Sequence, residues 1–252
     1  MTKQFAGKTA LVTGASRGIG ASTSIALARE GAAKVILHYN SFAEGAEQTA
    51  AEVRKAGAET ALIQSDLSSQ DGIAKLTNEL RNSDIDLLIN NAGHLVQRAK
   101  LLEFTGDLFD QVMNLNVKSM YFVSQALVPR MLEKGSGVIV NVSSIAARNG
   151  GGAGATIYSA AKAAVATITK GMAKELAPRG IRVNAVSPGT VDNYFHEKHS
   201  NREILDSVIA ATPAGRLGTN EEVADTIVFL CSEASRYIYG QTIEINGGMY
   251  MV

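Results

Sequence analysis

The fold is decided by the stretch Thr9-Ala10-Leu11-Val12-Thr13-Gly14-Ala15-Ser16-Arg17-Gly18-Ile19-Gly20, in which a short apolar run meets a glycine-rich turn. An alanine-rich run follows and ends at Gly31, so the pattern predicts a strand, a turn and a helix. Glycine adopts positive φ and lets the backbone approach a ligand closely, while the N-terminus of the next helix favours an anionic phosphate. The spacing is Gly-x-x-x-Gly-x-Gly rather than the more familiar Gly-x-Gly-x-x-Gly, but the physics is the same. The stretch therefore predicts a nucleotide-binding turn.

The alternation of apolar strands and helical segments continues along the first half of the chain. Strands are expected at Val35-Ile36-Leu37, Thr60-Ala61-Leu62-Ile63 and Ile85-Asp86-Leu87-Leu88-Ile89, with helices over about 43–56 and after Ser69. Continuous apolar strands between helices indicate a parallel sheet that binds ligands at the carboxyl ends of its strands. We therefore predict an α/β fold, a single Rossmann-type domain over residues 1–252 whose doubly wound parallel sheet carries helices on both faces.

Composition limits the classes of partner. With 252 residues, of which 46% are hydrophobic, the chain is long enough for one large core. Its 24 basic and 24 acidic residues are mixed along the chain, so it has no basic stripe for nucleic acid or an anionic membrane. Cys231 is the only cysteine and is expected to be a small buried hydrophobe. The N-terminus lacks the apolar core of a signal peptide and no apolar run reaches membrane-spanning length, so we expect a cytoplasmic protein.

The end of the second strand indicates which nicotinamide cofactor the turn accepts. An NAD site usually has an acidic residue there, whereas this chain reads His38-Tyr39-Asn40-Ser41 and has no carboxylate before Glu44. Asn40 and Ser41 can donate hydrogen bonds to a 2′-phosphate, and Arg17 either supplies the countercharge or is a solvated loop residue. We predict NADP(H) rather than NAD(H). Asp66, at the end of the third strand, either caps the next helix, faces solvent or contacts the adenine.

A tyrosine and a lysine stand four residues apart in the run Tyr158-Ser159-Ala160-Ala161-Lys162, which is alanine-rich and expected to be helical. An unperturbed tyrosine titrates near pH ~10, and lowering its pKa by about three units takes roughly 4 kcal/mol. A cation about 4 Å away contributes on that order at an effective dielectric constant of about 20. The pair is therefore either an ordinary helix surface or an acid–base pair, and the neighbouring motifs decide.

Two further positions carry groups suited to such chemistry. Asn116 lies in a helical segment expected from about Gly106 to Glu133, where asparagine is unfavourable. Asn116 either forms a hydrogen bond to a neighbouring side chain, or it binds a water molecule or stabilises a backbone kink near a site. Ser143-Ser144 ends the next strand. A serine at this position either stabilises the turn or forms a hydrogen bond to a substrate carbonyl.

Taken together and in this order, these motifs resemble the short-chain dehydrogenase/reductase family over essentially the whole chain, and its 3-oxoacyl-[acyl-carrier-protein] reductase-like members most of all. The matching segments are Thr13 to Gly20, Asp66-Leu67, Asn90-Asn91-Ala92-Gly93, Asn116, Ser143-Ser144, Tyr158 to Lys162 and Ser187-Pro188-Gly189. The resemblance implies that about 1–140 mainly binds the cofactor, and that about 141–252 carries the catalytic and substrate half with a variable lid over about 193–212.

The resemblance also implies a catalytic tetrad. Tyr158 acts as general acid in reduction and base in oxidation, and Ser144, with Ser143 as its rival, polarises the carbonyl. Lys162 lowers the tyrosine pKa and bonds the nicotinamide ribose, while Asn116 holds a water that relays protons. The implied cofactor contacts are Gly14, Ser16, Arg17, Gly18, Ile19, Gly20, Asn40, Ser41, Asp66, Leu67, Asn91, Ala92, Gly93, Tyr158, Lys162, Pro188, Gly189 and Val191.

Two positions depart from the family pattern. Asn193 stands where many members have a threonine that contacts the carboxamide or phosphate, and Asn246 stands where many have aspartate. Candidate substrate contacts are His94 and the lid residues Tyr194, Phe195, His196 and His199, each of which is otherwise a loop or surface residue. No pair of histidines has a convincing metal-ligand arrangement, so no metal is expected.

The leading prediction is an NADP(H)-dependent oxidoreductase that reduces a carbonyl to a secondary alcohol, like a 3-oxoacyl thioester reductase. Its alternatives are a reductase or dehydrogenase of small ketones, sugars or other alcohols and, less favoured because the tetrad is complete, a non-catalytic nucleotide sensor. An acyl carrier protein is acidic and needs a basic landing patch, for which only Arg130, Lys134 and Arg179 are scattered candidates. The resemblance also implies a homotetramer.

Overall fold

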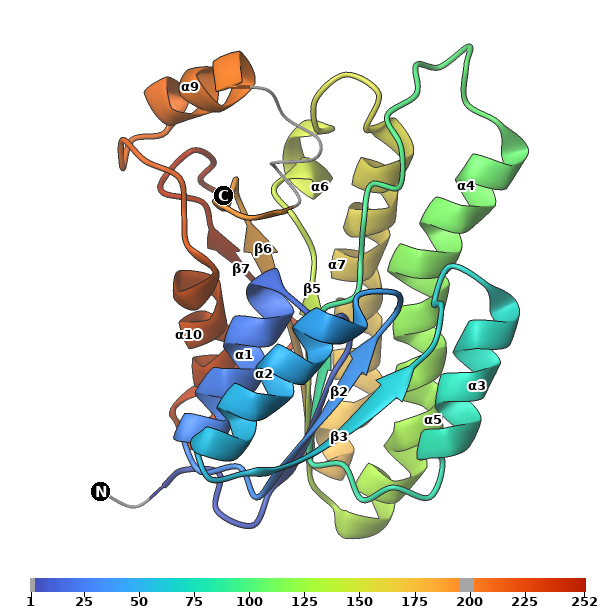
Figure 1. Cartoon of the computed structure of the whole chain (residues 1–252), viewed down its shortest axis with the longest axis vertical. Helices are drawn as coiled ribbons and strands as arrows, with labels where there is room; N and C mark the ends of the chain where they lie inside the picture. Colours follow the sequence, from blue (N-terminus) through green and yellow to red (C-terminus); the bar gives the residue numbers. More distant parts are fainter. Residues whose placement is uncertain (1–2, 195–201) are drawn as a thin grey trace.

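Seven parallel strands form one sheet in the computed structural model, which describes residues 3–194 and 202–252. The order is β3-β2-β1-β4-β5-β6-β7, and each neighbouring pair is parallel. The strands are β1 (Thr9–Val12), β2 (Lys34–Tyr39), β3 (Glu59–Gln64), β4 (Leu87–Asn90), β5 (Gly137–Val142), β6 (Ile181–Pro188) and β7 (Thr242–Ile245). The predicted doubly wound parallel sheet is confirmed (Figure 1).

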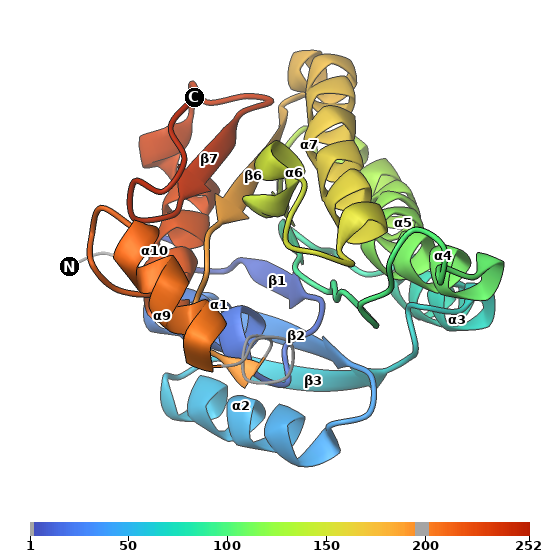
Figure 2. The same cartoon turned by 90° about the horizontal axis from the view of Figure 1, so that it is seen from above.

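Helices cover both faces of the sheet (Figures 1 and 2). One face carries α1 (Gly18–Arg29), α2 (Ala43–Lys55) and α10 (Asn220–Cys231), and the other carries α3 (Gln70–Leu80), α5 (Ser119–Lys134) and α7 (Thr156–Leu176). The shorter elements are α4 (Gly106–Met113), a π-helix (Asn114–Lys118), α6 (Ala146–Asn149), two 3-10 turns (Ala177–Arg179 and Glu233–Ser235) and α9 (Arg202–Ala211). No helix in the described part of the chain is long and apolar enough to cross a membrane.

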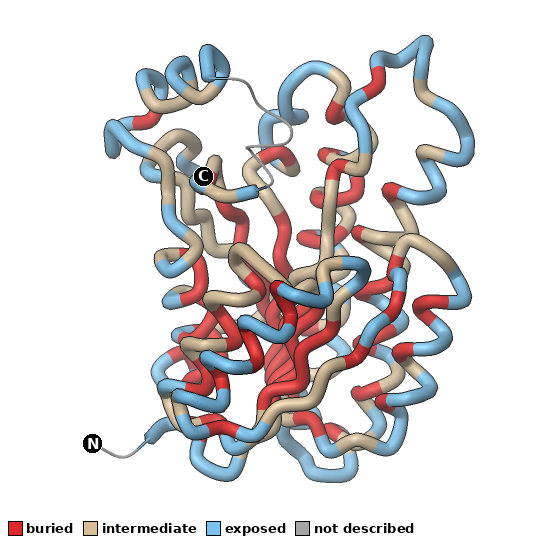
Figure 3. Tube along the Cα trace, viewed as in Figure 1, coloured by how far each residue is buried: buried red, intermediate tan, exposed pale blue. Residues whose placement is uncertain are grey.

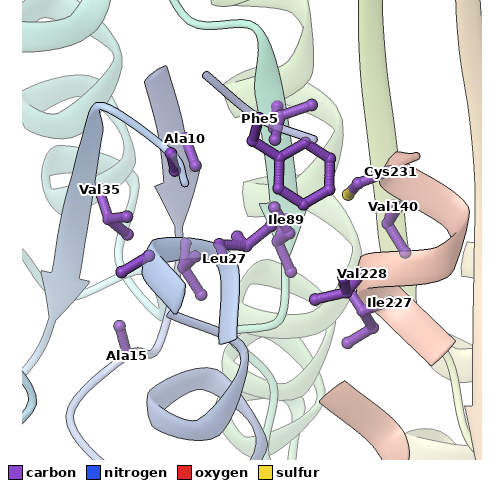
Figure 4. Close-up of a cluster of buried hydrophobic side chains, with 14 of the residues drawn as sticks. Phe5, Ala10, Ala15, Leu27, Val35, Ile89, Val140, Ile227, Val228 and Cys231 are labelled. Atoms are coloured by element: carbon purple, nitrogen blue, oxygen red, sulfur yellow. The ribbon is translucent and has the colours of Figure 1, made fainter. Parts of the chain in front are cut away.

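The core has two halves, one on each face of the sheet. Successive side chains of a strand point to opposite faces, so Ala10 and Val12 pack against α1 and α10 while Leu11 packs against α3 and α5. Figure 3 shows the buried residues concentrated along the strands, and Figure 4 shows the first half of the core, including Cys231. Burial raises the pKa of the Cys231 thiol to about 12, so this side chain is a small hydrophobe as predicted.

The crevice of such a fold lies where the strand order reverses, which here is between β1 and β4. The loops after these two strands are tied together by side chains. The hydroxyl of Thr13 accepts hydrogen bonds from the backbone N–H of Asn91 and of Ala92, both at 3.0 Å. The carboxamide of Asn91 donates to the carbonyl oxygens of Thr13 at 2.9 Å and Gly14 at 3.0 Å. This clamp, formed by Thr13 and Asn91, fixes the two sides of the crevice.

The structure locates the mid-helix asparagine and the three cations considered for a carrier protein. The helical segment expected from about Gly106 to Glu133 is observed as α4, the π-helix that contains Asn116, and α5, which follow one another without a gap. The three cations considered for a carrier protein lie at the amino edge of the sheet, because Arg130 and Lys134 precede β5 and Arg179 precedes β6. The loop after Lys134 and the loop after Arg179 are in contact at Gly135 and Gly180.

The packing of α1 on the glycine turn generates a stability prediction. A methyl group at Gly20 would lie against the backbone carbonyl of Gly14 and 2.6 Å from Nδ2 of Asn91, so Gly20→Ala should lower the free energy of unfolding by about 1–3 kcal/mol. Gly171 is also helical but has nothing within 4 Å of such a methyl group, so Gly171→Ala should be neutral or stabilising by about 0.5–1 kcal/mol. Urea unfolding followed by circular dichroism compares the two, and equal effects would show that Gly20 is not sterically constrained.

Candidate active site

A cleft of about 460 Å³ opens at the carboxyl edge of the sheet, over the ends of β1, β4, β5 and β6. Residues from both halves of the chain line it, including the glycine turn and the catalytic candidates Ser144, Tyr158 and Lys162. Figure 2 looks down on this edge, with α9 above it. The expectation that the motifs meet at the carboxyl ends of the strands is met.

Most of the predicted cofactor contacts line this cleft, and six do not. The six are Ser16, Gly20, Asn40, Ser41, Asp66 and Leu67. Gly20 packs against the carbonyl group of Gly14, and Leu67 is 2% exposed and belongs to the hydrophobic core, so the side chain of Leu67 is not available to a ligand. Asn40, Ser41 and Asp66 are exposed and lie beyond the cleft at the ends of β2 and β3.

The glycine turn has the properties of a phosphate cradle. Gly14 and Gly18 have φ angles of 66° and 59°, a region that side chains disfavour. A Cβ added at Gly18 would find no atom closer than 3.6 Å, so the space above this residue is open. No side chain caps the start of α1, whereas Ser69 caps α3 and Thr219 caps α10. The first N–H groups of α1 are therefore suited to the pyrophosphate of a dinucleotide.

Arg17 is stacked between two aromatic rings. Its guanidinium carbon lies 4.0 Å from the ring centroid of Phe42 and 4.1 Å from that of Tyr194. Phe42 follows Ser41 directly, so the guanidinium is held at the end of β2, where a 2′-phosphate is expected. Stacking occupies the faces of a guanidinium and leaves its N–H edge for hydrogen bonds, which suits an oxyanion.

Asp66 does not cap the following helix. Its Oδ1 atom accepts hydrogen bonds from the backbone N–H and the hydroxyl of Ser68, at 2.9 and 2.7 Å, and α3 is capped by Ser69 instead. Asn40 donates to the same carboxylate oxygen over 3.4 Å. The ends of β2 and β3 are thereby linked beside the glycine turn, and the adenine contact of Asp66 stays a prediction.

His38 forms a hydrogen bond to the glycine turn, a contact that the sequence did not predict. Its Nδ1 atom accepts a hydrogen bond from the backbone N–H of Gly14 at 3.3 Å, and Nε2 lies 3.0 Å from the carbonyl oxygen of Ser65. Burial lowers the pKa of His38 to about 4, so the imidazole is neutral at neutral pH. The neutral ring connects the turn after β1 to the end of β3.

Both serines line the cleft, but Ser144 rather than Ser143 contacts Tyr158. The hydroxyl of Ser143 is buried and donates to the carbonyl oxygen of Lys162 at 2.8 Å. The hydroxyl of Ser144 accepts a hydrogen bond from the backbone N–H of Ala146 at 3.1 Å and is hydrogen-bonded to the phenol of Tyr158. The structure therefore brings together the serine and the tyrosine that the family pattern pairs.

Lys162 is buried, and its ammonium donates to the carbonyl oxygen of Val142 at 2.9 Å. It lies 5.7 Å from the ring centroid of Tyr158. Burial lowers the pKa of Lys162 to about 8 and raises that of Tyr158 to about 12, an increase that the bond to Ser144 only moderates. Desolvation of the phenol is the largest cause of the raised tyrosine pKa, and the lowering of this pKa by Lys162 stays a prediction.

Asn116 binds the backbone of the loop after β4. Its carboxamide nitrogen donates to the carbonyl oxygens of His94 and Val112, both at 2.9 Å, and its oxygen accepts from the N–H of His94 at 3.1 Å. A Cβ added at Gly93 would lie 2.6 Å from Nζ of Lys162 and 2.8 Å from Oδ1 of Asn116. Asn116 and Lys162 thus both approach Gly93, where an added methyl group would displace one or both side chains.

The beginning of the lid packs on the cofactor side of the cleft. Asn193, which replaces the usual threonine, donates to the side-chain oxygen of Asn220 at 3.1 Å, next to Gly18. Tyr194 stacks on Arg17, and the apolar residues Ile204, Leu205 and Val208 of α9 line the cleft. The other lid candidates, Phe195, His196 and His199, lie outside the described residues.

Asn246 has a structural role in place of the usual aspartate. Its nitrogen donates to the carbonyl oxygen of Tyr250 at 2.9 Å, a bond that an aspartate carboxylate could not make. His94 lines the cleft as suggested, and the sequence analysis missed Arg98, Asn149 and Met249, which also line it and belong to no motif. Within the described ranges, no group of three or more His, Cys, Asp or Glu side chains could hold a metal ion.

Comparisons with known proteins agree with this geometry. Residues 14–250 match the family described as enoyl-(acyl carrier protein) reductase. The 3-oxoacyl-[acyl-carrier-protein] reductase FabG of Staphylococcus aureus is 38% identical over 246 residues, which are 97% of this chain and 98% of the relative. A solved short-chain dehydrogenase/reductase family protein superposes with a TM-score of 0.88 at 33% identity, covering 99% of this chain and 100% of its own. A gluconate 5-dehydrogenase from Burkholderia cenocepacia, in complex with NADP and tartrate, has a TM-score of 0.88, 31% identity and coverage of 98% and 97%.

The buried histidine generates a pH prediction. The unfolded chain binds a proton at His38 near pH 6.5, whereas the folded chain does so only near 4, so stability should fall as the pH drops through this window. The full loss is about 3 kcal/mol. Urea unfolding at steps between pH 6.5 and 4.5 measures this loss of stability. Carboxylates with lowered pKa values, such as Glu222, affect the stability mainly at lower pH. His38→Gln should be less stable at pH 7 but show a flatter pH profile, and an equally steep profile would contradict the assignment.

Proposed function

Because the chain belongs to the short-chain dehydrogenase/reductase family of oxidoreductases, we propose that it reduces a carbonyl group to a secondary alcohol with NADPH. The observation that carries the proposal is the position of Tyr158, Ser144 and Lys162 on the wall of the cleft that also contains the glycine turn. A proton donor, a carbonyl-binding hydroxyl and a dinucleotide cradle then face one space.

The side chains of the cleft supply the proton. Bound NADPH contributes a hydride to the carbonyl carbon, so NADPH, a proton and the ketone yield NADP⁺ and the alcohol. The Ser144 hydroxyl binds the carbonyl oxygen, and Tyr158 protonates that oxygen as negative charge develops on it. With a pKa of about 12, Tyr158 is protonated throughout the neutral range, so the proton to be donated is in place.

Lys162 and Asn116 complete the proposed tetrad. With a pKa of about 8, Lys162 is mostly protonated at neutral pH and gives up its proton far more readily than an exposed lysine. We assign it to return a proton to Tyr158 after turnover and to bond the nicotinamide ribose. Asn116 is assigned to the proton relay, which is supported by its approach to Lys162 across Gly93.

The preference for NADP(H) is supported by the aromatic stacking of Arg17 at the end of β2. It is also supported by the absence of any acidic residue between the end of β2 and Glu44. The solved gluconate 5-dehydrogenase contains NADP. A carboxylate at this position would repel a 2′-phosphate, whereas a fixed guanidinium attracts it.

Two substrate classes have support. The similarity to FabG and the apolar side of α9, with Ile204, Leu205 and Val208, favour a 3-oxoacyl thioester. The similarity to a gluconate 5-dehydrogenase solved with tartrate favours a small hydroxylated acid. A carrier protein is not supported by the basic residues considered for it, because Arg130 pairs with Glu133, Lys134 pairs with Asp86, and both lie at the far edge of the sheet.

We also propose the homotetramer that the family resemblance implies. Exposed apolar side chains include Phe109 on α4, Tyr121 and Phe122 on α5, and Phe229 on α10. Apolar side chains gathered on the surface are typical of subunit contacts.

Replacing the proposed acid should separate chemistry from binding. Tyr158→Phe should lower kcat for NADPH-dependent reduction of an acetoacetyl thioester at least about a hundredfold, because general acid catalysis is lost. Fluorescence titration should give nearly the parental Kd for NADPH. Tyr237→Phe removes the hydroxyl of a tyrosine that is 96% exposed and serves as the control. Parental turnover in Tyr158→Phe would refute the assignment.

Removing the stacked guanidinium should change the cofactor preference. Arg17→Ala should reduce the ratio of kcat/KM for NADPH to that for NADH about ten- to a hundredfold, since a charge-assisted bond to the phosphate is lost. Arg29→Ala removes the same charge from the opposite end of α1 and should leave the ratio unchanged. A parental ratio at or below one, or no change in Arg17→Ala, would exclude this role.

A further inference from the structure

The turn that carries Ser144 is built on a very short helix. The backbone N–H of Ala146 donates to the Ser144 hydroxyl at 3.1 Å, and the N–H of Ala147 donates to the Ser144 carbonyl oxygen at 2.9 Å. Both donors belong to α6, which has four residues, Ala146–Asn149. A helix of about one turn is not stable by itself, so contacts with the rest of the fold must hold α6 and Ser144 in place.

The end of α6 is bound to the last strand of the sheet. Nε of Arg148 donates to Oε1 of Glu244 at 2.8 Å, and this ion pair joins α6 to β7. The side chains of Arg148 and Glu244 are 29% and 11% exposed, so water screens their attraction less than it screens an ion pair on the surface. Neither residue is among the described residues that line the cleft, so the pair is not part of the cleft wall itself.

Glu244 has a fixed place beside the end of β6. It is the register partner of Ser187, and the N–H of Gly189 donates to the carbonyl oxygen of Ile245 at 2.8 Å. Oε2 of Glu244 is buried and has no hydrogen-bond partner among the described residues. A largely buried carboxylate is costly without a cation, so the ion pair fixes the guanidinium of Arg148 at this strand.

The start of α6 is bound to the neighbouring strand. The N–H of Ile145 donates to the carbonyl oxygen of Pro188 at 2.9 Å, and Figure 2 shows α6 beside β6. Pro188 lines the cleft and is one of the predicted cofactor contacts. The short helix is therefore held to β6 at one end and to β7 at the other, and these two contacts set the position of Ser144 relative to the cofactor side of the cleft.

We propose that Arg148 is a positioning residue, which holds α6 through its ion pair with Glu244 and thereby orients the Ser144 hydroxyl toward the substrate carbonyl. The proposal rests on the reductase activity proposed above. A group that binds the reacting oxygen is effective only in a narrow range of positions, and a displacement of about 1 Å can cost about a hundredfold in rate. Arg148 acts through the backbone of α6 and does not contact the reacting atoms.

Removing the guanidinium should lower turnover without weakening cofactor binding. Arg148→Gln should reduce kcat for NADPH-dependent reduction of an acetoacetyl thioester about tenfold or more, because Ser144 is less well placed when the carbonyl reacts. Fluorescence titration should give nearly the parental Kd for NADPH, since the glycine turn is unchanged. Arg148→Lys keeps the charge and should retain part of the lost rate. Arg54→Gln is the matched control, because it removes an arginine from an exposed ion pair with Glu47 on α2, and it should keep the parental kcat.

A double-mutant cycle tests the ion pair itself. Glu244→Gln should have the same effect as Arg148→Gln, and the double variant should be no slower than either single variant, because all three lose the same interaction. Parental kcat in Arg148→Gln, or losses that multiply in the double variant, overturn the proposal while the reductase assignment stands. An increase in the Kd for NADPH as large as the loss of kcat also overturns it, since it would reveal a general distortion of the cleft.

Hydrogen exchange tests the position of α6 without a substrate. Mass spectrometry should find faster amide exchange in peptides that cover residues 144–149 of Arg148→Gln than in the parental protein, and no change in Arg54→Gln. If the parental protein reduces no carbonyl compound, the proposed function fails, and this measurement decides the role of the ion pair by itself. Faster exchange then supports the hold of Arg148 on α6, and unchanged exchange refutes it.

Discussion

The structure depends on the clamp formed by Thr13 and Asn91 at the point where the strand order reverses. The chain leaves β1 and β4 toward opposite faces of the sheet, so no regular ladder joins the two loops. The Thr13 hydroxyl accepts from two backbone N–H groups, and the Asn91 carboxamide donates to two carbonyl oxygens. These bonds satisfy backbone groups that the sheet leaves unpaired and bring α1 so close to the turn that only glycine fits at position 20. The phosphate cradle and the loop that carries the substrate-side residues are therefore positioned by one set of contacts.

Burial then decides how protons are held in the cleft. The same low polarity raises the pKa of Tyr158 to about 12 and lowers that of Lys162 to about 8, since each shift favours the neutral form of its group. A phenolate left after proton donation is a far stronger base than the neutral amine beside it, so the proton of Lys162 is drawn back to Tyr158. In the proposed reaction, Lys162 is therefore suited to return a proton to Tyr158 after turnover.

The sequence predicted the sheet, the glycine turn and the tyrosine–lysine pair because each depends on residues that are close together in the chain. Asn116 was suspected for its low helix propensity, and the π-helix gives the reason. The aromatic stacking of Arg17 and the support of Gly14 by His38 join residues that meet only after folding, so no local pattern could reveal them. Arg98 belongs to an irregular loop without a motif. By contrast, the remote position of Arg130 and Lys134 follows from strand order, since residues that precede a parallel strand lie at the edge opposite the ligands.

The segment predicted to begin the lid packs on residues of the predicted cofactor site. Tyr194 stacks on the guanidinium that faces the expected 2′-phosphate, and Asn193 bonds the first residue of α10 next to Gly18. A ligand that attracts Arg17 would act on a side chain that is already in contact with Tyr194. Cofactor binding and the position of the segment that begins at Asn193 are therefore expected to be linked.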